Sequence, residues 1–334
     1  MLFYTFAGIH FIFPQKKPTI IMKRAYAQIH LAVLLWGFTG ILGKAISLSA
    51  PVLVWYRMLI TAGILAIILT NRGDWIKIIR KDLVRIIGIG VMYAIHWVAF
   101  YASIKYSNAS IAMVCLATAS VFTALLDPLL NKGKFNYIEI FLSFIAIAGV
   151  YCIYALQPHA TNGSAGMVHF EWGVILGVIA AIISAIFTVL NKPLAEKYQP
   201  RTIVFYEMTI GLIFLSVLAP FYIYNQGETL QLLPQGWDYL WIFLLSYCCT
   251  VWGQSLAMSA LKHLSAFTIT LSVNLEPVYG IILAFLIYKE NNQLGYGFYI
   301  GMGFIFMSLM LQILIIVFRN KAAKDLRKNK FPIQ

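Results

Sequence analysis

The sequence predicts an all-α integral membrane protein, with ten transmembrane helices arranged as two inverted five-helix repeats. Three observations carry this prediction. The 334 residues are 61% hydrophobic and only 11% charged, with a mean hydropathy of +0.80, whereas a soluble chain carries roughly a quarter charged residues. Ten apolar segments each have about 20 residues, the length that crosses a bilayer as a helix. The hydropathy profile also shows the same rhythm of five segments in each half of the chain.

The predicted spans follow one another with mostly short connections, and none alternates with period two as a membrane strand would. The connection 157–170, expected to be an external linker, and the connection 225–237 are the longest, and neither contains Lys or Arg. No connection is long enough to form a soluble catalytic domain. The predicted spans are 27–46, 52–70, 83–104, 109–130, 137–156, 171–191, 202–224, 238–261, 265–288 and 294–318.

The distribution of basic residues predicts the orientation of these spans. With the N-terminus inside, most of the 25 Lys and Arg residues fall in cytoplasmic segments, as the positive-inside rule requires. We therefore expect a multi-pass protein of the cell membrane (inner or plasma membrane) with both termini in the cytoplasm. The inner loops account for the net charge of +13, so no nucleic-acid partner is predicted.

Both ends of the chain lie outside the predicted spans. Residues 1–26 are expected to form a cytoplasmic N-terminal extension, and residues 319–334 a basic cytoplasmic tail. Within residues 1–21 an apolar run is broken by Pro14 and is too short to span. We interpret it as a dispensable extension or a misassigned start, since Met22 opens a stretch typical of a natural start. A short interfacial helix is the alternative.

The two halves match as repeats over residues 27–156 and 171–318. A shift of 157 residues lays spans 3 and 4 over spans 8 and 9 and places Lys105 on Lys262, and each half has five spans in the same hydropathy rhythm. Because five is an odd number of spans, the second repeat enters the membrane from the opposite side. Inverted repeats permit two symmetry-related conformations, with a site near the midplane at the repeat interface. Alternating access is therefore the predicted mechanism.

Local motifs, in order along the chain, carry a family resemblance. Span 1 contains "LLWGFTGILGKA", Arg57 lies early in span 2, and the turn between spans 3 and 4 reads "YASIKYSNASIA". Span 9 and the residues after it read "LEPVYGIILAFLIYKE", with Glu276-Pro277 in the middle of the span and Glu290 at the end. Over about 27–317 the chain resembles the EamA family of the drug/metabolite transporter superfamily.

The resemblance implies efflux or exchange of small metabolites, often amino acids, without ATP hydrolysis. It does not imply which substrate. The first half departs from the family pattern, because Ala119-Ser120 replaces the Glu-Pro pair and Gly133 replaces the terminal glutamate. The two repeats thus follow the same path but differ in chemistry at the level of the predicted site.

Two ionisable residues inside spans are the first candidates for function, because a charge at the centre of a membrane helix costs about 2.5–3.5 kcal/mol. Glu276, in span 9, is a candidate partner for a proton or a substrate amine. Its alternative is a structural carboxylate that bonds a neighbouring helix. Arg57, in the outer part of span 2, is a candidate clamp for a substrate carboxylate. Its alternatives are snorkelling to the headgroups or fixed pairing with a buried acid.

Two further ionisable candidates lie in spans 7 and 3. Glu207 occupies the place in span 7 that Arg57 occupies in span 2, which suggests a gate-like pairing, with Lys192 or Arg201 as its nearest basic partners. His96 is a candidate for coupling by protonation. Its alternative is a hydrogen-bonded core residue.

Large aromatic and neutral polar side chains complete the candidate set. The aromatic rings could stack on a substrate or its cation, whereas most Tyr and Trp residues of such chains form interfacial belts. The amides could bind substrate or join helices to one another. The candidates are Trp36, Trp97, Tyr101, Trp252 and Tyr279, and the amides Gln254 and Asn274.

The leading function is a secondary transporter, and an intramembrane enzyme or a non-transporting scaffold is the alternative. The sequence lacks the His-Glu-x-x-His, Gly-x-Ser-x-Gly and P-loop motifs, so no catalytic residue, metal site or cofactor is predicted. The expected partners are a small-molecule metabolite and the lipid bilayer, with protons as an open possibility. The glycines of segment 295–304 suggest close helix packing, and either a monomer or a homodimer is compatible with them.

Overall fold

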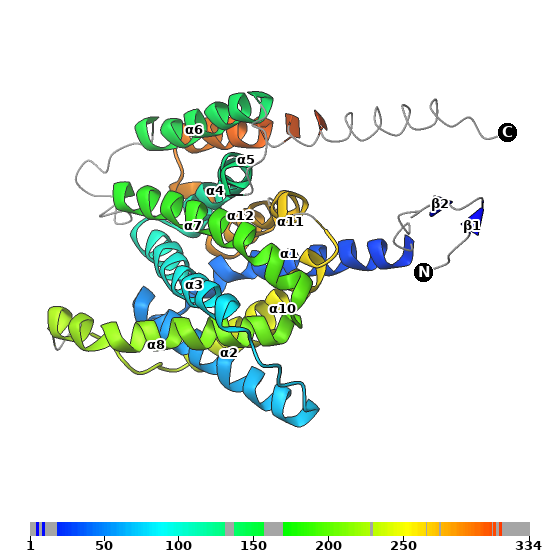
Figure 1. Ribbon diagram of the computed structural model, residues 1–334. Helices are drawn as coiled ribbons and strands as arrows, with labels where there is room; N and C mark the ends of the chain where they lie inside the picture. The colour runs from blue at the N-terminus through cyan, green and yellow to red at the C-terminus, as the bar shows by residue number, and fades with distance from the viewer. Residues whose placement is uncertain are drawn as a thin grey trace.

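The computed structural model describes residues 5–6, 9–10, 19–130, 137–156, 170–227, 230–264, 266–273, 275–308, 310–311 and 314–315. In these residues the ordered elements are helices, apart from a short antiparallel pair of Thr5–Phe6 with Ile9–His10. Figure 1 shows the helices packed side by side, with α6 near one edge of the molecule and α2 and α8 near the other.

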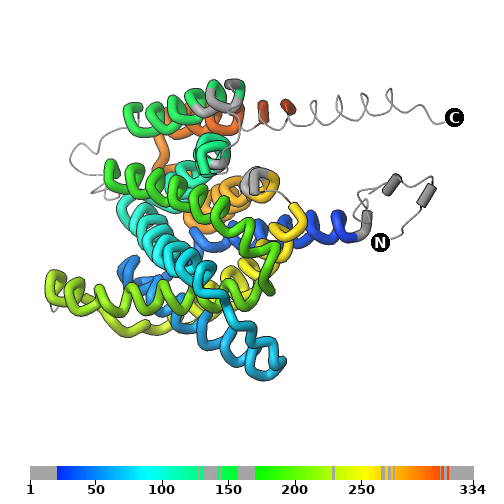
Figure 2. Tube along the Cα trace, viewed as in Figure 1, coloured from blue at the N-terminus to red at the C-terminus, as the bar shows by residue number. Residues whose placement is uncertain are grey.

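Helices from the first half of the chain pack directly against helices from the second half, so the two halves do not form separate bundles. α3 packs against both α7 and α8, and α1 packs against α10 and α12. The chain trace in Figure 2 shows this mixing, because blue and cyan segments lie among green and yellow ones. The first-half helices are α1 (Thr19–Ala45), α2 (Ala50–Arg72), α3 (Arg80–Tyr106), α4 (Ala109–Ala117), α5 (Ala119–Leu130) and α6 (Tyr137–Leu156).

The second half contains the same kind of elements in the described residues, and several of its helices are short. Its last apolar helix, Tyr296–Ser308, lies beside α6, where Gly301 and Gly149 let the two backbones approach closely. The other helices are α7 (Phe170–Lys197), α8 (Pro200–Gln226), α9 (Asp238–Leu244), η2 (Leu245–Trp252), α10 (Gly253–Leu261), α11 (Ala266–Val273), α12 (Leu275–Tyr288) and η3 (Glu290–Gln293).

Seven helical stretches in the described residues are long and apolar enough to cross a membrane, and they coincide with seven of the predicted spans. Three shorter apolar helices, Phe144–Leu156, Leu275–Tyr288 and Tyr296–Ser308, lie within the other three. The prediction of an all-helical membrane chain is confirmed, whereas the count of ten spans stays a prediction. The seven stretches are Ile21–Ala45, Ala50–Arg72, Arg80–Tyr106, Ala109–Leu130, Phe170–Lys197, Pro200–Gln226 and Asp238–Leu261.

The outer surface of the helices is apolar. On α8, Phe221 is 72% exposed and Tyr224 is 87% exposed, and Phe144 on α6 is 66% exposed. Large exposed apolar surfaces are unfavourable in water and mark membrane or protein contact. Backbone polar groups of these helices are satisfied internally, as the hydrocarbon layer demands. This face is therefore suited to lipid.

Span 4 is divided near its middle. Between α4 and α5, Thr118 turns the chain, and its hydroxyl donates to the carbonyl of Cys115 at 2.6 Å. In span 9, α11 ends at Val273 and α12 begins at Leu275, and residue 274 between them lies outside the described residues.

Close approach of α3 to α8 depends on Gly90. A Cβ at this position would lie 2.7 Å from the backbone oxygen of Glu207 and 2.9 Å from Ile210 Cβ, whereas a Cβ at Gly88, two residues earlier, would meet nothing within 4 Å. We expect Gly90→Ala to destabilise the protein by about 1–3 kcal/mol through overpacking. Gly88→Ala should be neutral or slightly stabilising, because alanine favours the helix. The comparison is the unfolding midpoint of both variants in detergent, and equal midpoints would contradict it.

Candidate functional site

A cavity of about 90 Å³ lies between the two halves of the chain. Its walls come from α1, α2, α3 and α4 in the first half and from α7, α10, α11 and α12 in the second. It extends from Arg57 and Phe100 to the ends of α7 and α10. Its polar and charged lining residues are Trp36, Thr39, Arg57, Tyr93, His96, Trp97, Ser184, Thr188, Asn191, Gln254 and Glu276.

Arg57 is the positive charge of this cavity, and it is only 2% exposed. Its Nε donates to Thr250 Oγ1 at 2.8 Å and its Nη1 donates to the Tyr101 hydroxyl at 2.7 Å. The guanidinium carbon lies 3.7 Å from the centre of the Trp97 ring, a cation–π contact. No carboxylate of the described residues is within ion-pair distance. Arg57 therefore does not snorkel and has no fixed acidic partner there.

Glu276 is the negative charge of the same cavity, at the start of α12 and 6% exposed. Thr39 Oγ1 lies 3.4 Å from its Oε1 but 2.6 Å from the carbonyl of Trp36. A hydroxyl has one proton to donate, and the shorter contact is the stronger one. Among the described residues, the carboxyl of Glu276 is thus only weakly hydrogen-bonded, although it is buried beside the cavity.

His96 also lines the cavity, and its Nδ1 lies 2.8 Å from the carbonyl of Ala180. A carbonyl only accepts, so Nδ1 carries a proton and donates it. In the neutral ring Nε2 is then an acceptor. Both interpretations of His96, as a proton-coupling residue and as a hydrogen-bonded core residue, are therefore compatible with the structure, since His96 is hydrogen-bonded and lines the cavity.

The π-helix η2 shapes the wall beside Arg57. Its i→i+5 bonding is rare and is frequently found at functional sites. Thr250, which accepts from Arg57, donates in turn to the carbonyl of Leu245, five residues earlier, at 3.0 Å. The indole of Trp36 donates to the carbonyl of Cys249 at 2.8 Å. The sequence predicts a plain helix here, and the π-helical turn and the role of Thr250 were missed.

The other predicted residues divide into four groups. Gln254 lines the cavity and accepts from the Tyr93 hydroxyl at 3.3 Å. Tyr101 lies directly behind Arg57. Trp252, which is 48% exposed, and Tyr279 lie outside the cavity lining. The predicted residue Asn274 lies outside the described residues.

Glu207 is fully buried in α8 and does not line the cavity. The predicted pairing with Lys192 or Arg201 is absent among the described ion pairs. Lys192 instead donates to the carbonyls of Leu261 and Leu264, at 2.7 and 2.8 Å, and pairs with the exposed Glu196. The proposed match of Glu207 to Arg57 in the repeats therefore stays a prediction, and neither basic partner expected from the sequence pairs with Glu207 among the described residues.

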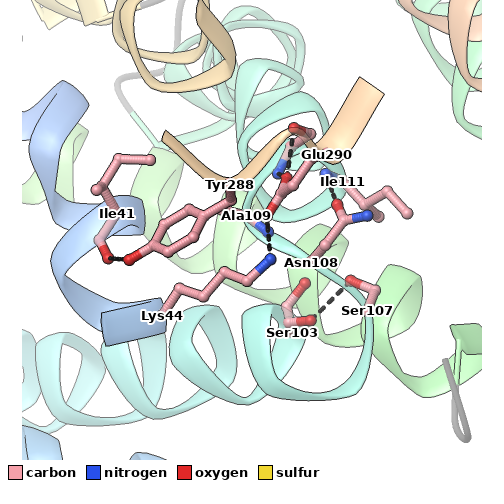
Figure 3. Close-up of polar contacts among 10 residues, drawn as sticks. Ile41, Lys44, Ser103, Ser107, Asn108, Ala109, Ile111, Tyr288 and Glu290 are labelled. Carbon is pink, nitrogen blue, oxygen red and sulfur yellow. Dashed lines mark hydrogen bonds and ion pairs between the residues drawn. The ribbon is translucent and has the colours of Figure 1, made fainter. Parts of the chain in front are cut away.

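A polar cluster holds the opposite end of the molecule together (Figure 3). Glu290, with no exposed surface, accepts from Lys44 Nζ at 2.7 Å and from the backbone N–H of Ala109 at 3.2 Å. Its other oxygen accepts from the N–H and hydroxyl of Ser110, at 2.9 and 2.6 Å. The N-terminus of a helix favours a negative charge. The cluster thus ties the end of α1 and the start of η3 to the start of α4.

Comparisons with known proteins agree with this architecture. A model described as the EamA-like transporter family matches residues 23–155 and 171–314, one match in each half. A solved structure, described only as "Crystal structure of protein", superposes with a TM-score of 0.60 over 88% of this chain and 98% of that one, at 14% identity. This likeness concerns the fold alone.

Relatives in sequence carry transporter names. An uncharacterized transporter from Clostridium kluyveri is 26% identical and covers 92% of this chain and 97% of its own length. A probable terminal-alkyne amino-acid exporter from Streptantibioticus cattleyicolor is 25% identical over 53% of this chain and 56% of its own. The family matches span most of both halves, and the chain is a multi-pass membrane protein that belongs to the EamA-like transporter family.

Proposed function

We propose that this protein is a secondary transporter that moves small amino acids across the cell membrane by efflux or exchange. The observation that carries the proposal is the pair of opposite charges in one cavity. Arg57 is buried without an acidic partner within ion-pair distance among the described residues, and Glu276 is buried with one weak bond. Buried charges normally have partners. A zwitterionic substrate would supply both.

In this proposal each of the two charges binds one end of the substrate. The guanidinium, held by Thr250, Tyr101 and Trp97, presents its remaining N–H groups to a carboxylate, for which its planar fork is suited. Glu276 accepts the substrate ammonium. The cavity walls also include Phe187, Met258 and Ile269, and they favour an apolar substrate side chain.

The proposed mechanism is alternating access between the repeats 27–156 and 171–318. The cavity lining continues to Asn191 and Leu261, toward the ends of α7 and α10, where the basic residues of the predicted cytoplasmic side lie. The Glu290 cluster closes the other end. These features support a conformation that is open to the cytoplasm, with both termini on that side.

Transport by proteoliposomes tests the proposal. Vesicles loaded with pooled labelled amino acids, sugars or nucleosides should lose the amino acids alone, and unlabelled amino acid outside should accelerate the loss by exchange. The cavity variant Glu276→Gln should reduce this exchange. The exposed variant Glu171→Gln, on α7, is the matched control and should not.

Failure of the proposal has a defined form. If no solute leaves, or if Glu276→Gln releases amino acids as fast as the wild type, the cavity does not carry substrate. A non-transporting scaffold, or an intramembrane enzyme, then becomes the better explanation of the same fold.

A further inference from the structure

Glu207 is a second buried carboxyl that the substrate site does not use. It has no exposed surface, and neither carboxyl oxygen has a hydrogen-bond partner among the described residues. Its polar neighbour is Asn191, on α7 and 1% exposed. In the described part of the chain, the side-chain nitrogen and oxygen of Asn191 also make no hydrogen bond of good geometry. Adjacent buried polar groups with so little hydrogen bonding are rare in folded proteins.

In the described part of the chain, no cation lies within ion-pair distance of the Glu207 carboxylate. α3 contributes Tyr93 as the facing titratable group, and α7 contributes the neutral Asn191. On α2, which also packs against α8, Arg57 is engaged with Thr250, Tyr101 and Trp97. α10 contributes Gln254, which is neutral and bonded to Tyr93. An unpaired ionised carboxylate in this setting costs several kcal/mol, and a bound proton removes that cost.

Glu207 is also connected to the cavity. Its two polar neighbours, Asn191 and Tyr93, both line the cavity wall, so a proton has a polar route between Glu207 and the cavity. The substrate charges lie on other residues, since Arg57 and Glu276 belong to α2 and α12. The site for a proton and the site for substrate are therefore adjacent but separate.

We propose that Glu207 is a proton-binding site, and that loading and unloading it through Asn191 and Tyr93 couples a proton to substrate movement. The proposal rests on the transport function above and deepens it. It assigns the coupling proton to Glu207 and leaves Glu276 to the substrate ammonium. In the pseudo-symmetric repeats Glu207 matches Arg57, so one position of the repeat binds the substrate charge and the other binds the proton.

The test compares exchange with proton-driven accumulation in proteoliposomes, using a labelled mixture of protein amino acids. Exchange at equal pH on both sides needs no net proton movement, and Glu207→Gln should retain it. A pH gradient, imposed in each direction in separate arms, should drive about tenfold accumulation in one arm for the wild type and none for Glu207→Gln. The control is Glu196→Gln, because Glu196 is exposed and lies near the same end of α7 as Asn191. This variant should accumulate amino acid like the wild type.

Three results would overturn the inference. One is accumulation by Glu207→Gln equal to that of the wild type. Another is a wild type whose accumulation follows a sodium gradient at constant pH, which would make the ligand a metal cation. If Glu207→Gln does not fold, the wild-type protein still tests the inference. Addition of amino acid to it in weakly buffered detergent solution should change the number of bound protons, which a pH dye detects. The third contradicting result would be no change in the dye signal.

The two proposals fail separately in this experiment. If the wild type shows no exchange, the transport function itself fails. If the wild type exchanges and Glu207→Gln both exchanges and accumulates, only the assignment of the proton fails.

Discussion

Arg57→Gln is expected to abolish substrate binding, with a rise of at least about thirtyfold in the Kd of the transported amino acid. In the proposed complex the substrate carboxylate neutralises a guanidinium that has no acidic partner within ion-pair distance among the described residues. Removal of one member of a buried charge pair costs roughly 2–5 kcal/mol, and each 1.4 kcal/mol is tenfold in Kd. Calorimetry in detergent, with the amino acid that the vesicle screen identifies, measures the change.

Two further substitutions separate charge from geometry. Arg57→Lys keeps the charge but cannot reproduce both the bond to Thr250 and the stacking on Trp97, because lysine lacks the planar fork. It should therefore restore only part of the affinity. Arg72→Gln is the matched control, because it replaces arginine by glutamine at the exposed end of the same helix, α2. It should leave the Kd unchanged.

Substrate analogues identify which end of the molecule Arg57 binds. The wild type should bind an amino-acid amide, which lacks the carboxylate, much more weakly than the amino acid. Arg57→Gln should bind both with similar weak affinity. If Arg57→Gln weakens the amide as much as it weakens the acid, the arginine supports the cavity wall rather than the substrate carboxylate.

Most of the helical order of this fold could be predicted from hydropathy, because the length of an apolar run is set by the thickness of the bilayer. Span 2 was predicted at 52–70 and the helix covers Ala50–Arg72. The interior of spans was not predictable in the same way. Nothing in the apolar run 238–261 distinguishes the π-helical turn of η2 from an α-helix. Span 4 likewise gives no strong signal at Thr118, since threonine is common in membrane helices.

The candidate site was predicted in its charges but not in its contacts. Arg57 and Glu276 stand out because ionisable groups in apolar runs are rare. Their surroundings depend on which helix faces meet, and a single sequence does not contain that information. Asn191 was missed for this reason, because one amide near the end of a span has no distinguishing pattern. The sequence also places Trp252 among the candidates, but its side chain is 48% exposed and lies outside the cavity lining.

Glu290→Gln is expected to open the end of the molecule that the Glu290 cluster closes. The amide has one acceptor oxygen in place of two, and its NH₂ group would oppose the donors of Ala109 or Ser110. It also loses the ion pair with Lys44. Breaking a buried pair by removing one partner costs about 3–5 kcal/mol, which corresponds to a shift of more than a hundredfold between two conformations. The equilibrium should therefore move toward the outward-open state.

Thiol labelling measures this opening. The four native cysteines are first replaced by serine or alanine. A single cysteine is then introduced at Ile104, which is 3% exposed near the end of α3, as the labelling target. An impermeant reagent added outside intact spheroplasts should label it slowly in the wild-type background and at least tenfold faster with Glu290→Gln. Glu171→Gln, exposed at the start of α7, should not change the rate.

The ranking of two variants tests the mechanism of closure. Lys44→Met removes the ion pair but leaves Glu290 with three donors from the start of α4, so it should accelerate labelling less than Glu290→Gln. If both variants lower the unfolding midpoint without faster labelling, the cluster is a structural contact in every conformation.

The opposite end offers a physical reason for the resting state. Its described ion pairs, Lys192–Glu196 and Lys197–Asp82, leave their carboxylates partly exposed, and exposed pairs contribute little. In the proposed mechanism the closed outer end is thus the more strongly held of the two, and we expect the protein to rest open toward the predicted cytoplasm until substrate binding offsets the difference.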